Sequence, residues 1–294
     1  MGRGQEMREA LKRGETITAP GAYDAITGRI AQYLGFKYTY MGGYQTGARF
    51  ALPEALVTMT EFCQVASEIL SGARGELSVI MDLGIGFGEP THMARTIRHL
   101  DAIGVAAVHI EDEVGPRRTS LQKPEHTSAI VPIEQYLDRL RYAMQIRKDG
   151  DLFIIARTNA YKSTAGGTRE MAVERLEAAL ELGADAVYID QAKAREDLEY
   201  FRKAFPDIPM MALASAQSFT VNEFKELGYN IIVYPGTTIV AAVDAIYRAY
   251  KGVKETGKLD FPAETDQEMR LFLRHELCRF PEYWEIEEKT TLQY

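Results

Sequence analysis

The sequence is poor in cysteine and tryptophan and has no long apolar run. Its 294 residues include two cysteines, Cys63 and Cys278, and one tryptophan. Two cysteines make neither a disulfide framework nor a zinc cluster, and their scarcity is compatible with a reducing compartment. No run approaches the roughly 18 apolar residues that a membrane-spanning helix needs, and residues 1–6 lack the apolar core of a signal peptide. We therefore expect a cytoplasmic protein that does not enter a membrane.

Positive charge is also scarce. The chain carries 34 Lys plus Arg against 42 Asp plus Glu, which gives a formal net charge of −8. An acidic chain without basic clusters is a poor nucleic-acid binder, so we expect no nucleic-acid partner. The apolar fraction of 46% and the charged fraction of 26% are those of an ordinary globular protein. This length fits two average domains or one α/β barrel.

The sequence shows one repeating pattern, in which short runs of β-branched or aromatic residues alternate with longer segments of helical periodicity. The candidate strands are residues 16–19, 37–40, 77–82, 105–110, 151–156, 186–189, 208–212 and 230–234. Apolar residues recur at helical spacing between them, as in 169–182, and several of these segments run into a glycine. Eight strand–helix units predict a (β/α)8 barrel, an α/β fold whose active sites lie at the carboxyl ends of the strands. A doubly wound open sheet is the alternative.

The eight units end near residue 257. We assign residues 1–257 to the barrel and residues 258–294 to extra C-terminal helices rich in charge and aromatic side chains. The aromatics of this extension are Phe261, Phe272, Phe280, Tyr283 and Trp284. They are too apolar for an unpacked tail, so we expect the extension to pack on the barrel or on a neighbouring subunit.

Charged residues mark the ends of three successive predicted strands. The third strand ends in Asp82, the fourth is followed by Glu111 and the fifth by Arg157. Carboxylates that converge on one barrel mouth repel each other, so they generally bind a cation or lie beside one. Oxygen ligands suit Mg²⁺, and an arginine opposite suits a substrate carboxylate. The pattern predicts a small anionic substrate bound to a divalent metal that stabilises an enolate or alkoxide.

Each of these residue types also has a simpler structural explanation. A carboxylate at one strand end is usually a loop cap or a surface charge, and one of Asp112 and Glu113 is expected to face solvent. His109, inside the fourth strand, and Cys63, in an apolar helical stretch, are expected in the core. The glycine-rich residues 84–88 lack the spacing of a dinucleotide fingerprint, so nucleotide binding is not expected.

An ordered series of motifs resembles the isocitrate lyase/phosphoenolpyruvate mutase superfamily over about residues 14–257. The motifs are Gly-Ala-Tyr-Asp at 21–24, Gly-Phe at 35–36, Tyr-Met-Gly-Gly at 40–43, Asp-Leu-Gly-Ile-Gly-Phe-Gly at 82–88, Gly-Val-Ala at 104–106, His-Ile-Glu-Asp at 109–112, Ala-Arg-Thr-Asn-Ala at 156–160 and Gly-Ala-Asp at 183–185. Each motif alone is weak, but the ordered set is specific.

The resemblance implies a homotetramer, a dimer of dimers in which neighbours exchange C-terminal helices. It also implies a 2-hydroxy or 2-oxo acid substrate and a Mg²⁺ ion, with Mn²⁺ as an alternative. The turn at 40–43 matches a backbone cradle for the substrate's carboxylate. By position, the implied metal ligands are Asp82, Glu111 and Glu54, the substrate-binding residues are Tyr40, Gly42, Gly43, Arg157 and Asp190, and the catalytic residues are Arg157, Glu111 and Thr119.

The chain departs from the commonest pattern of that superfamily. Gly84 replaces a second Asp after the third strand, which removes a carboxylate from the metal site, and Asn159 stands where Asp is common. In a gating loop the lyases carry Pro-Lys-x-Cys-Gly-His, whose Cys protonates the product. The chain instead has Pro-Arg-Arg-Thr-Ser-Leu at 116–121, which resembles the phosphonopyruvate branch, while residues 130–134 resemble the lyases. The hydroxyl of Thr119 is too weak an acid to replace that thiol directly.

The leading hypothesis is a Mg²⁺-dependent lyase that cleaves a carbon–carbon bond of a small 2-hydroxy di- or tricarboxylic acid. Substrates of the 2-methylisocitrate or 2,3-dimethylmalate type would yield a 2-oxo acid and a carboxylate. An alternative that needs no Cys acid is decarboxylation of a 2-oxo acid such as oxaloacetate, or mutase or hydrolase chemistry on phosphonopyruvate. A third is a non-catalytic binding homologue, because Gly84 and Thr119 replace a metal ligand and the loop acid.

Overall fold

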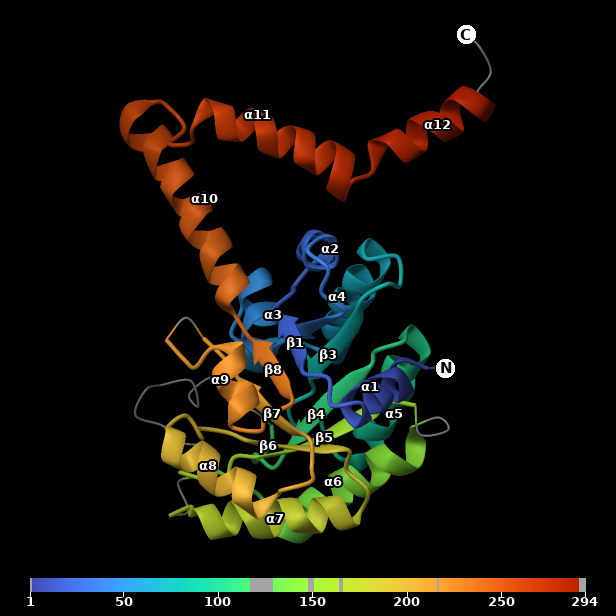
Figure 1. The fold of residues 1–294 in the computed structure, drawn as a ribbon, viewed down its shortest axis with the longest axis vertical. Coiled ribbons are helices and arrows are strands. Elements are labelled where there is room, and N and C mark those ends of the chain that lie inside the picture. Colours follow the sequence, from blue (N-terminus) through green and yellow to red (C-terminus); the bar gives the residue numbers. More distant parts are fainter. Residues whose placement is uncertain (1, 117–128, 148–150, 164–165, 216, 291–294) are drawn as a thin grey trace.

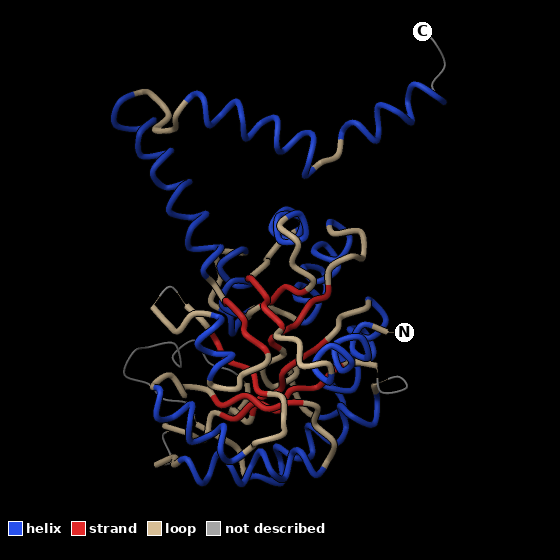
Figure 2. Tube along the Cα trace, viewed as in Figure 1, coloured by secondary structure: helices blue, strands red, loops and turns tan. Residues whose placement is uncertain are grey.

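The computed structural model describes residues 2–116, 129–147, 151–163, 166–215 and 217–290, and its centre is a barrel of parallel strands ringed by helices (Figures 1 and 2). The strands are β1 (Ile17–Pro20), β2 (Tyr38–Met41), β3 (Ser78–Asp82), β4 (Ala107–Glu111), β5 (Phe153–Thr158), β6 (Ala186–Ile189), β7 (Met210–Leu213) and β8 (Ile231–Tyr234). They pair in the order β1-β8-β7-β6-β5-β4-β3-β2. A parallel bridge between Gly21 and Tyr40 nearly closes the circle between β1 and β2.

The predicted (β/α)8 barrel is confirmed, and the open doubly wound sheet is wrong. All eight predicted strands are present, and their observed bounds differ from the predicted bounds by at most two residues. β3, β4 and β5 are buried along their whole length. This burial is expected of parallel strands that are covered on both faces.

Helices alternate with the strands around the barrel. They are α2 (Ala25–Tyr33), α3 (Gly43–Arg49), the 3₁₀ turn Glu54–Leu56, α4 (Met59–Gly72), α5 (Pro90–Ile103), α6 (Ile133–Ile146), α7 (Arg169–Glu181), α8 (Arg195–Ala204) and α9 (Val221–Glu226). α4 begins with a capping box, in which Thr58 and Glu61 exchange side-chain hydrogen bonds with each other's backbone amides. Gly104 ends α5 with a left-handed φ of 81°, the cap expected from its position before β4.

The core has two layers, one between the strands and the helices and one inside the barrel. The first helix, α1 (Arg3–Lys12), covers the amino-terminal end of the barrel. Met7 is fully buried in the inner layer, and Arg8 pairs with Asp185 at 2.7 Å. Arg3 donates to the carbonyl of Gly104, just before β4. With this end covered, the carboxyl ends of the strands form the face on which a site can lie.

The last helices leave the barrel as an extended arm (Figure 1), and we call residues 237–290 the C-terminal arm. It consists of α10 (Thr237–Thr256), α11 (Ala263–Phe272), a π-helical turn (Leu273–Leu277) and α12 (Phe280–Thr290). The arm contacts α2 through the rings of Tyr33 and Phe272, whose centroids are 4.9 Å apart, and through a hydrogen bond from Arg29 to the Glu276 carbonyl at 2.7 Å.

Much of the apolar surface of the C-terminal arm is exposed. The exposed residues include Val240, Val243, Ile246, Tyr247, Tyr250, Leu259, Phe261, Phe280, Tyr283, Trp284 and Ile286. The described helices include none that is both long enough and apolar enough to cross a lipid bilayer.

Candidate active site at the carboxyl ends of the strands

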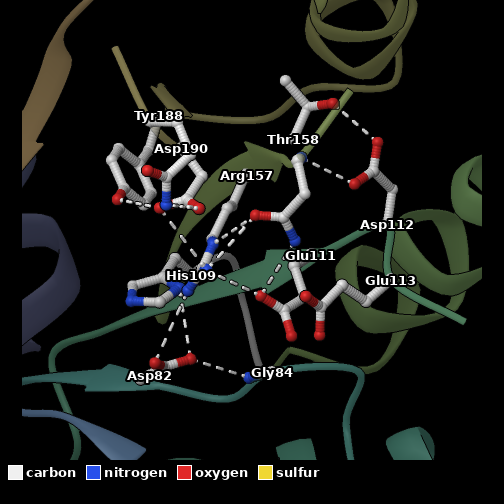
Figure 3. Close-up of polar contacts among 12 residues, drawn as sticks. Asp82, Gly84, His109, Glu111, Asp112, Glu113, Arg157, Thr158, Tyr188 and Asp190 are labelled. Atoms are coloured by element: carbon white, nitrogen blue, oxygen red, sulfur yellow. Dashed lines mark hydrogen bonds and ion pairs between the residues drawn. The ribbon is translucent and has the colours of Figure 1, made fainter. Parts of the chain in front are cut away.

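Four charged residues from consecutive strands meet at the carboxyl end of the barrel (Figure 3). Asp82 is the last residue of β3 and Glu111 is the last residue of β4. Arg157 lies in β5, and Asp190 directly follows β6. The strand register places Glu111 opposite Arg157. Parallel pairing therefore brings these strand ends to one rim of the barrel, as the sequence predicted.

The Arg157 guanidinium is the centre of this charged cluster. Its Nη2 lies 3.0 Å from Glu111 Oε2 and 3.7 Å from Asp190 Oδ1, and its Nη1 lies 3.5 Å from Asp82 Oδ2. Arg157 is 8% exposed and Glu111 is fully buried. Because buried charges are screened less by salt and water than exposed ones, these contacts are strong.

Burial and charge together shift the pKa values in the cluster. Burial raises the pKa of Glu111, and the Arg157 charge opposes that rise. Burial alone would lower the pKa of Arg157, but the surrounding carboxylates outweigh it and raise the pKa well above its ordinary value. Burial also acts to raise the pKa of Asp190, but the Arg157 charge and the hydrogen bonds from Gln191 and Tyr188 together outweigh burial, and the pKa is lowered. Perturbed pKa values of this kind concentrate at functional sites.

Asn159 holds the Glu111 and Arg157 side chains relative to one another. Its Nδ2 donates to Glu111 Oε2 at 3.2 Å, and its Oδ1 accepts from Arg157 Nη2 at 3.3 Å. An amide can serve both partners at once because it carries a donor and an acceptor. Asn159, which stands where Asp is common in the superfamily that the sequence resembles, is therefore part of the cluster.

A buried network around Asp112 fixes the end of β5. The Asp112 carboxylate accepts hydrogen bonds from the backbone N–H of Asn159 at 2.8 Å and from the Thr158 hydroxyl at 2.6 Å. It also pairs with Arg175 of α7 at 3.1 Å. Asp112 and Glu113 are both buried, so the expectation that one of them faces solvent is wrong. The structural role of Asp112 was not predicted from the sequence, because its hydrogen-bonding partners lie 46 to 63 residues away along the chain.

Tyr40 and His109 occupy the barrel interior. The Tyr40 hydroxyl lies 2.9 Å from His109 Nε2, and His109 Nδ1 lies 3.5 Å from Asp82 Oδ1. Burial lowers the pKa of His109 to about 4, so its ring is neutral at pH 7. The expected core position of His109 is confirmed. The Tyr40 carbonyl accepts hydrogen bonds from Ala22 and Gln45, so its hydroxyl and carbonyl are both engaged within the fold.

The two glycines predicted to cradle a carboxylate form the start of α3. Gly42 is the N-cap residue, and Gly43 is the first helical residue. The first amides of a helix have no partner inside it and therefore attract anions. The Glu54 carboxylate packs against Gly43, where a β-carbon would lie 2.1 Å from Glu54 Oε1. Any larger residue at position 43 would displace this carboxylate.

The carboxylates fit a divalent cation by charge and chemistry. Within the described residues, no group of three His, Cys, Asp or Glu side chains is already arranged to hold a metal. Three carboxylates nevertheless surround one guanidinium, from Asp82, Glu111 and Asp190 around Arg157. Three negative charges and one positive charge leave a formal excess that one divalent ion neutralises. Carboxylate oxygens are also the ligands that Mg²⁺ and Mn²⁺ accept readily.

A cavity of about 380 Å³ opens beside the cluster, with Asp82 and Gly84 in its lining. The Gly84 amide donates to Asp82 Oδ1 at 3.0 Å, and a β-carbon at position 84 would lie 3.6 Å from Glu111 Oε1. Because Gly84 has no side chain, nothing at this position separates the cavity from the carboxylates. Glu54 lines the same cavity. Thr119, which the sequence placed in the loop after β4, lies outside the described residues.

Comparison with known proteins identifies the family. The sequence profile of the phosphoenolpyruvate phosphomutase family matches residues 7–254. A probable 2-methylisocitrate lyase of Corynebacterium glutamicum is 31% identical over 286 residues, which cover 96% of this chain and 90% of that protein. The 2,3-dimethylmalate lyase of Eubacterium barkeri is 32% identical over 254 residues, 85% of each chain.

Solved structures agree with the sequence comparison. A crystal structure of 2,3-dimethylmalate lyase, described as a PEP mutase/isocitrate lyase superfamily member, superposes with a TM-score of 0.85 at 27% identity and covers 98% of this chain and 99% of that chain. An oxaloacetate acetylhydrolase in complex with 3,3-difluorooxalacetate superposes with a TM-score of 0.87 at 28% identity and covers 98% of this chain and 97% of that chain. The predicted resemblance is confirmed. The chain belongs to the phosphoenolpyruvate mutase/isocitrate lyase superfamily.

Proposed function

We propose that this protein is a metal-dependent lyase that cleaves a carbon–carbon bond of a small 2-hydroxy di- or tricarboxylic acid of the 2-methylisocitrate or 2,3-dimethylmalate type. The observation that carries the proposal is the buried arginine Arg157, held among three carboxylates at the strand ends. A buried arginine beside carboxylates that can bind a metal ion suits a substrate acid that develops negative charge during the reaction. The lyases among its relatives support the same reaction class.

The metal is Mg²⁺ in this proposal, with Mn²⁺ as an alternative. Asp82 and Glu111 would hold it, and Glu54, which lines the same cavity as Asp82, would be near enough to contribute. When bound, the metal supplies a Lewis acid that offsets negative charge on the oxygens of the substrate. The formal excess of carboxylates over Arg157 supports this assignment.

The substrate lies between the start of α3 and Arg157. The backbone at Gly42 and Gly43 receives one carboxylate, because helix-start amides favour anions. Arg157 receives the other carboxylate with its planar pair of donors. Asp190 orients that guanidinium, and the Tyr188 hydroxyl in turn donates to Asp190 at 2.7 Å. Tyr40 leads into this turn, and its side chain lies inside the barrel.

Cleavage proceeds as a retro-aldol reaction. Glu111, which lies at the end of β4 beside Arg157, accepts the proton of the 2-hydroxyl. The C2–C3 bond then breaks, C2 becomes the carbonyl of a 2-oxo acid, and the bonding electrons pass to C3 and its carboxylate as an enolate. Arg157 stabilises this enolate. A proton delivered to C3 from water or from a general acid of the chain completes the carboxylate product.

A second candidate reaction uses an oxaloacetate-like 2-oxo acid. It is favoured by the loop sequence at 116–121, which has no Cys to protonate a lyase product. The oxaloacetate acetylhydrolase that superposes on this chain also points to such an acid. Phosphonopyruvate chemistry remains a further variant on the same scaffold, because the loop resembles that branch.

The direct test is incubation of the protein and Mg²⁺ with 2-methylisocitrate, 2,3-dimethylmalate, oxaloacetate and phosphonopyruvate in separate reactions. Pyruvate from either of the first two supports the lyase. Carbon dioxide or oxalate from oxaloacetate supports the second candidate, and release of phosphate supports phosphonate hydrolysis. No product from the whole panel would remove both candidates and favour a non-catalytic binding protein.

The C-terminal arm packs on a neighbouring subunit, and the assembly is a homotetramer. Its exposed apolar side chains support this arrangement, because contiguous apolar patches are uncommon on monomers. Such an interface would divide the chain into a barrel at 1–257 and an exchanged helical extension at 258–294. A cytoplasmic location is supported by two cysteines that are both unpaired.

A further inference from the structure

The cavity beside Asp82 has a wall that is mostly hydrocarbon. Its apolar lining residues are Val57, Phe62, Leu83, Ile85 and Phe87, joined by Ala55 of the 3₁₀ turn. A volume of about 380 Å³ is far more than one water requires. Ligand pockets typically begin at about 300 Å³ and combine an apolar wall with a few polar groups. The space is therefore large enough to hold part of an organic ligand.

The aromatic part of this wall is held in place by strained backbone. Phe87 has a left-handed φ of 63°, which a bulky side chain seldom adopts. Its ring meets the Phe62 ring edge-to-face, with centroids 5.2 Å apart. Strain at a non-glycine residue persists only where the surrounding structure enforces it, and it concentrates at ligand sites. The surrounding packing therefore holds the Phe87 ring against the cavity.

The polar part of the lining is fixed as well. Arg139 of α6 is 5% exposed and donates from Nη1 to the carbonyls of Glu111 at 3.1 Å and Glu113 at 2.7 Å. These bonds tie the guanidinium to the end of β4. The other polar lining side chains are Glu54, Asp82, Glu89, His92 and Gln135. Arg139 thus forms a fixed part of the wall and is not a mobile charge that fills the space.

We propose that this cavity binds an apolar substituent on C3 of the acid, so that the preferred substrates carry an alkyl chain longer than methyl. The proposal rests on the lyase function proposed above and deepens it. The charged groups of the acid bind at Asp82, Glu111 and Arg157, and the cavity begins at Asp82 and Gly84. The side of the cavity formed by Phe62, Ile85 and Phe87 has no hydrogen-bond donor for a carboxylate, so the substituent that packs against this side is hydrocarbon.

The test is a series of 2-methyl-3-alkylmalates with methyl, ethyl, propyl and butyl groups at C3. Every member yields pyruvate, so one assay measures the whole series. We expect kcat/KM to rise about fourfold for each added methylene, and about 60-fold from methyl to butyl. A flat series, or one that falls after methyl while methyl itself is cleaved, overturns the cavity proposal and leaves the lyase function standing.

Two neighbouring variants identify the cavity as the cause. Ala55→Phe places a ring into the lining and should bring kcat/KM of the butyl compound down to that of the methyl compound. Leu56→Phe places the same ring one residue along the same 3₁₀ turn, at a side chain that is 56% exposed and absent from the lining. It should leave the length dependence as in the wild type. Equal effects of the two substitutions would overturn the proposal.

If no acid is cleaved, a binding measurement still tests the cavity proposal independently of the lyase function. Alkylsuccinates from methyl to butyl are titrated by calorimetry into the wild type and into Ala55→Phe, each with Mg²⁺. Affinity that rises with chain length in the wild type but not in Ala55→Phe supports the cavity proposal, whatever the reaction. Affinity independent of chain length, or no binding by any member, overturns it.

Discussion

Arg157 Nη2 lies 3.0 Å from Glu111 Oε2 where the two strands pair residue to residue, and both side chains are almost wholly removed from water. A buried carboxylate without such a partner would be driven to its neutral form. The Arg157 charge opposes the rise that burial causes in the Glu111 pKa, and Asn159 bridges both side chains at the barrel rim.

Replacing Arg157 by Ala should destabilise the protein and abolish cleavage. Removing one partner of a buried pair leaves charges uncompensated, so we expect the free energy of unfolding to fall by about 3 kcal/mol. Urea unfolding followed by circular dichroism measures this loss. Arg98→Ala, which removes an exposed arginine of α5, is the matched control and should change stability little. Equal stability of wild type and Arg157→Ala would show that the pair contributes nothing.

Thr119→Cys tests the missing loop acid. A thiol is a much stronger acid than an aliphatic hydroxyl, and a well-placed general acid contributes at least about 100-fold to rate. We expect turnover of 2,3-dimethylmalate to rise by about tenfold or more. Ser120→Cys places the same thiol one residue away and serves as control. Unchanged turnover in Thr119→Cys would mean that another group protonates the enolate.

Charge on the C-terminal arm should break the assembly. Val243, Tyr247 and Tyr250 share one face of α10, because helical residues three and four apart are neighbours. The double variant Val243→Asp/Tyr250→Asp should give the monomer mass of 33.0 kDa in light scattering, while the wild type gives a multiple of it. Ala245→Asp, at an exposed position two residues from both Val243 and Tyr247 and therefore on the other side of the helix, should leave the assembly intact. A wild type that is monomeric at micromolar concentration contradicts the proposed interface.

The two cysteines should differ sharply in reactivity. Burial raises the pKa of the Cys63 thiol to about 11, so almost none of it is thiolate at neutral pH, whereas Cys278 is exposed. Because the thiolate is the nucleophile, alkylation of native Cys63 should accelerate as pH rises towards 11. At pH 7.5 a disulfide reagent should titrate one thiol per native chain and two in urea. In Cys278→Ser the fast thiol should disappear. Rapid labelling of two thiols in the native wild type would show that Cys63 is accessible.

The strand ends were predictable from the sequence because they are local features. Asp82, Glu111 and Arg157 each stand at the end of a short apolar run, and parallel pairing then requires that they meet. The alternation of strand and helix patterns and the positions of the charged residues were therefore enough to predict the barrel and the charged residues at its rim.

The inner contacts were not predictable in this way. Asp112 meets Arg175 across 63 positions of the chain, and nothing in either local pattern signals the pairing. Tyr40 was assigned to the substrate because its turn contains Gly42 and Gly43, but the alternation of β2 directs its side chain into the barrel. The cavity wall depends on the left-handed backbone of Phe87, which a sequence does not reveal.

The central claim is that Asp82 and Glu111 together hold a divalent ion. Its most direct test is calorimetric titration of Mn²⁺ into the wild type, Asp82→Asn and Glu111→Gln, each with and without oxalate. We predict one ion per wild-type chain, bound more tightly with oxalate, and affinity at least about tenfold weaker in both variants, as expected when a ligand is lost. Wild-type affinity in both variants, or no binding by the wild type, would contradict the claim.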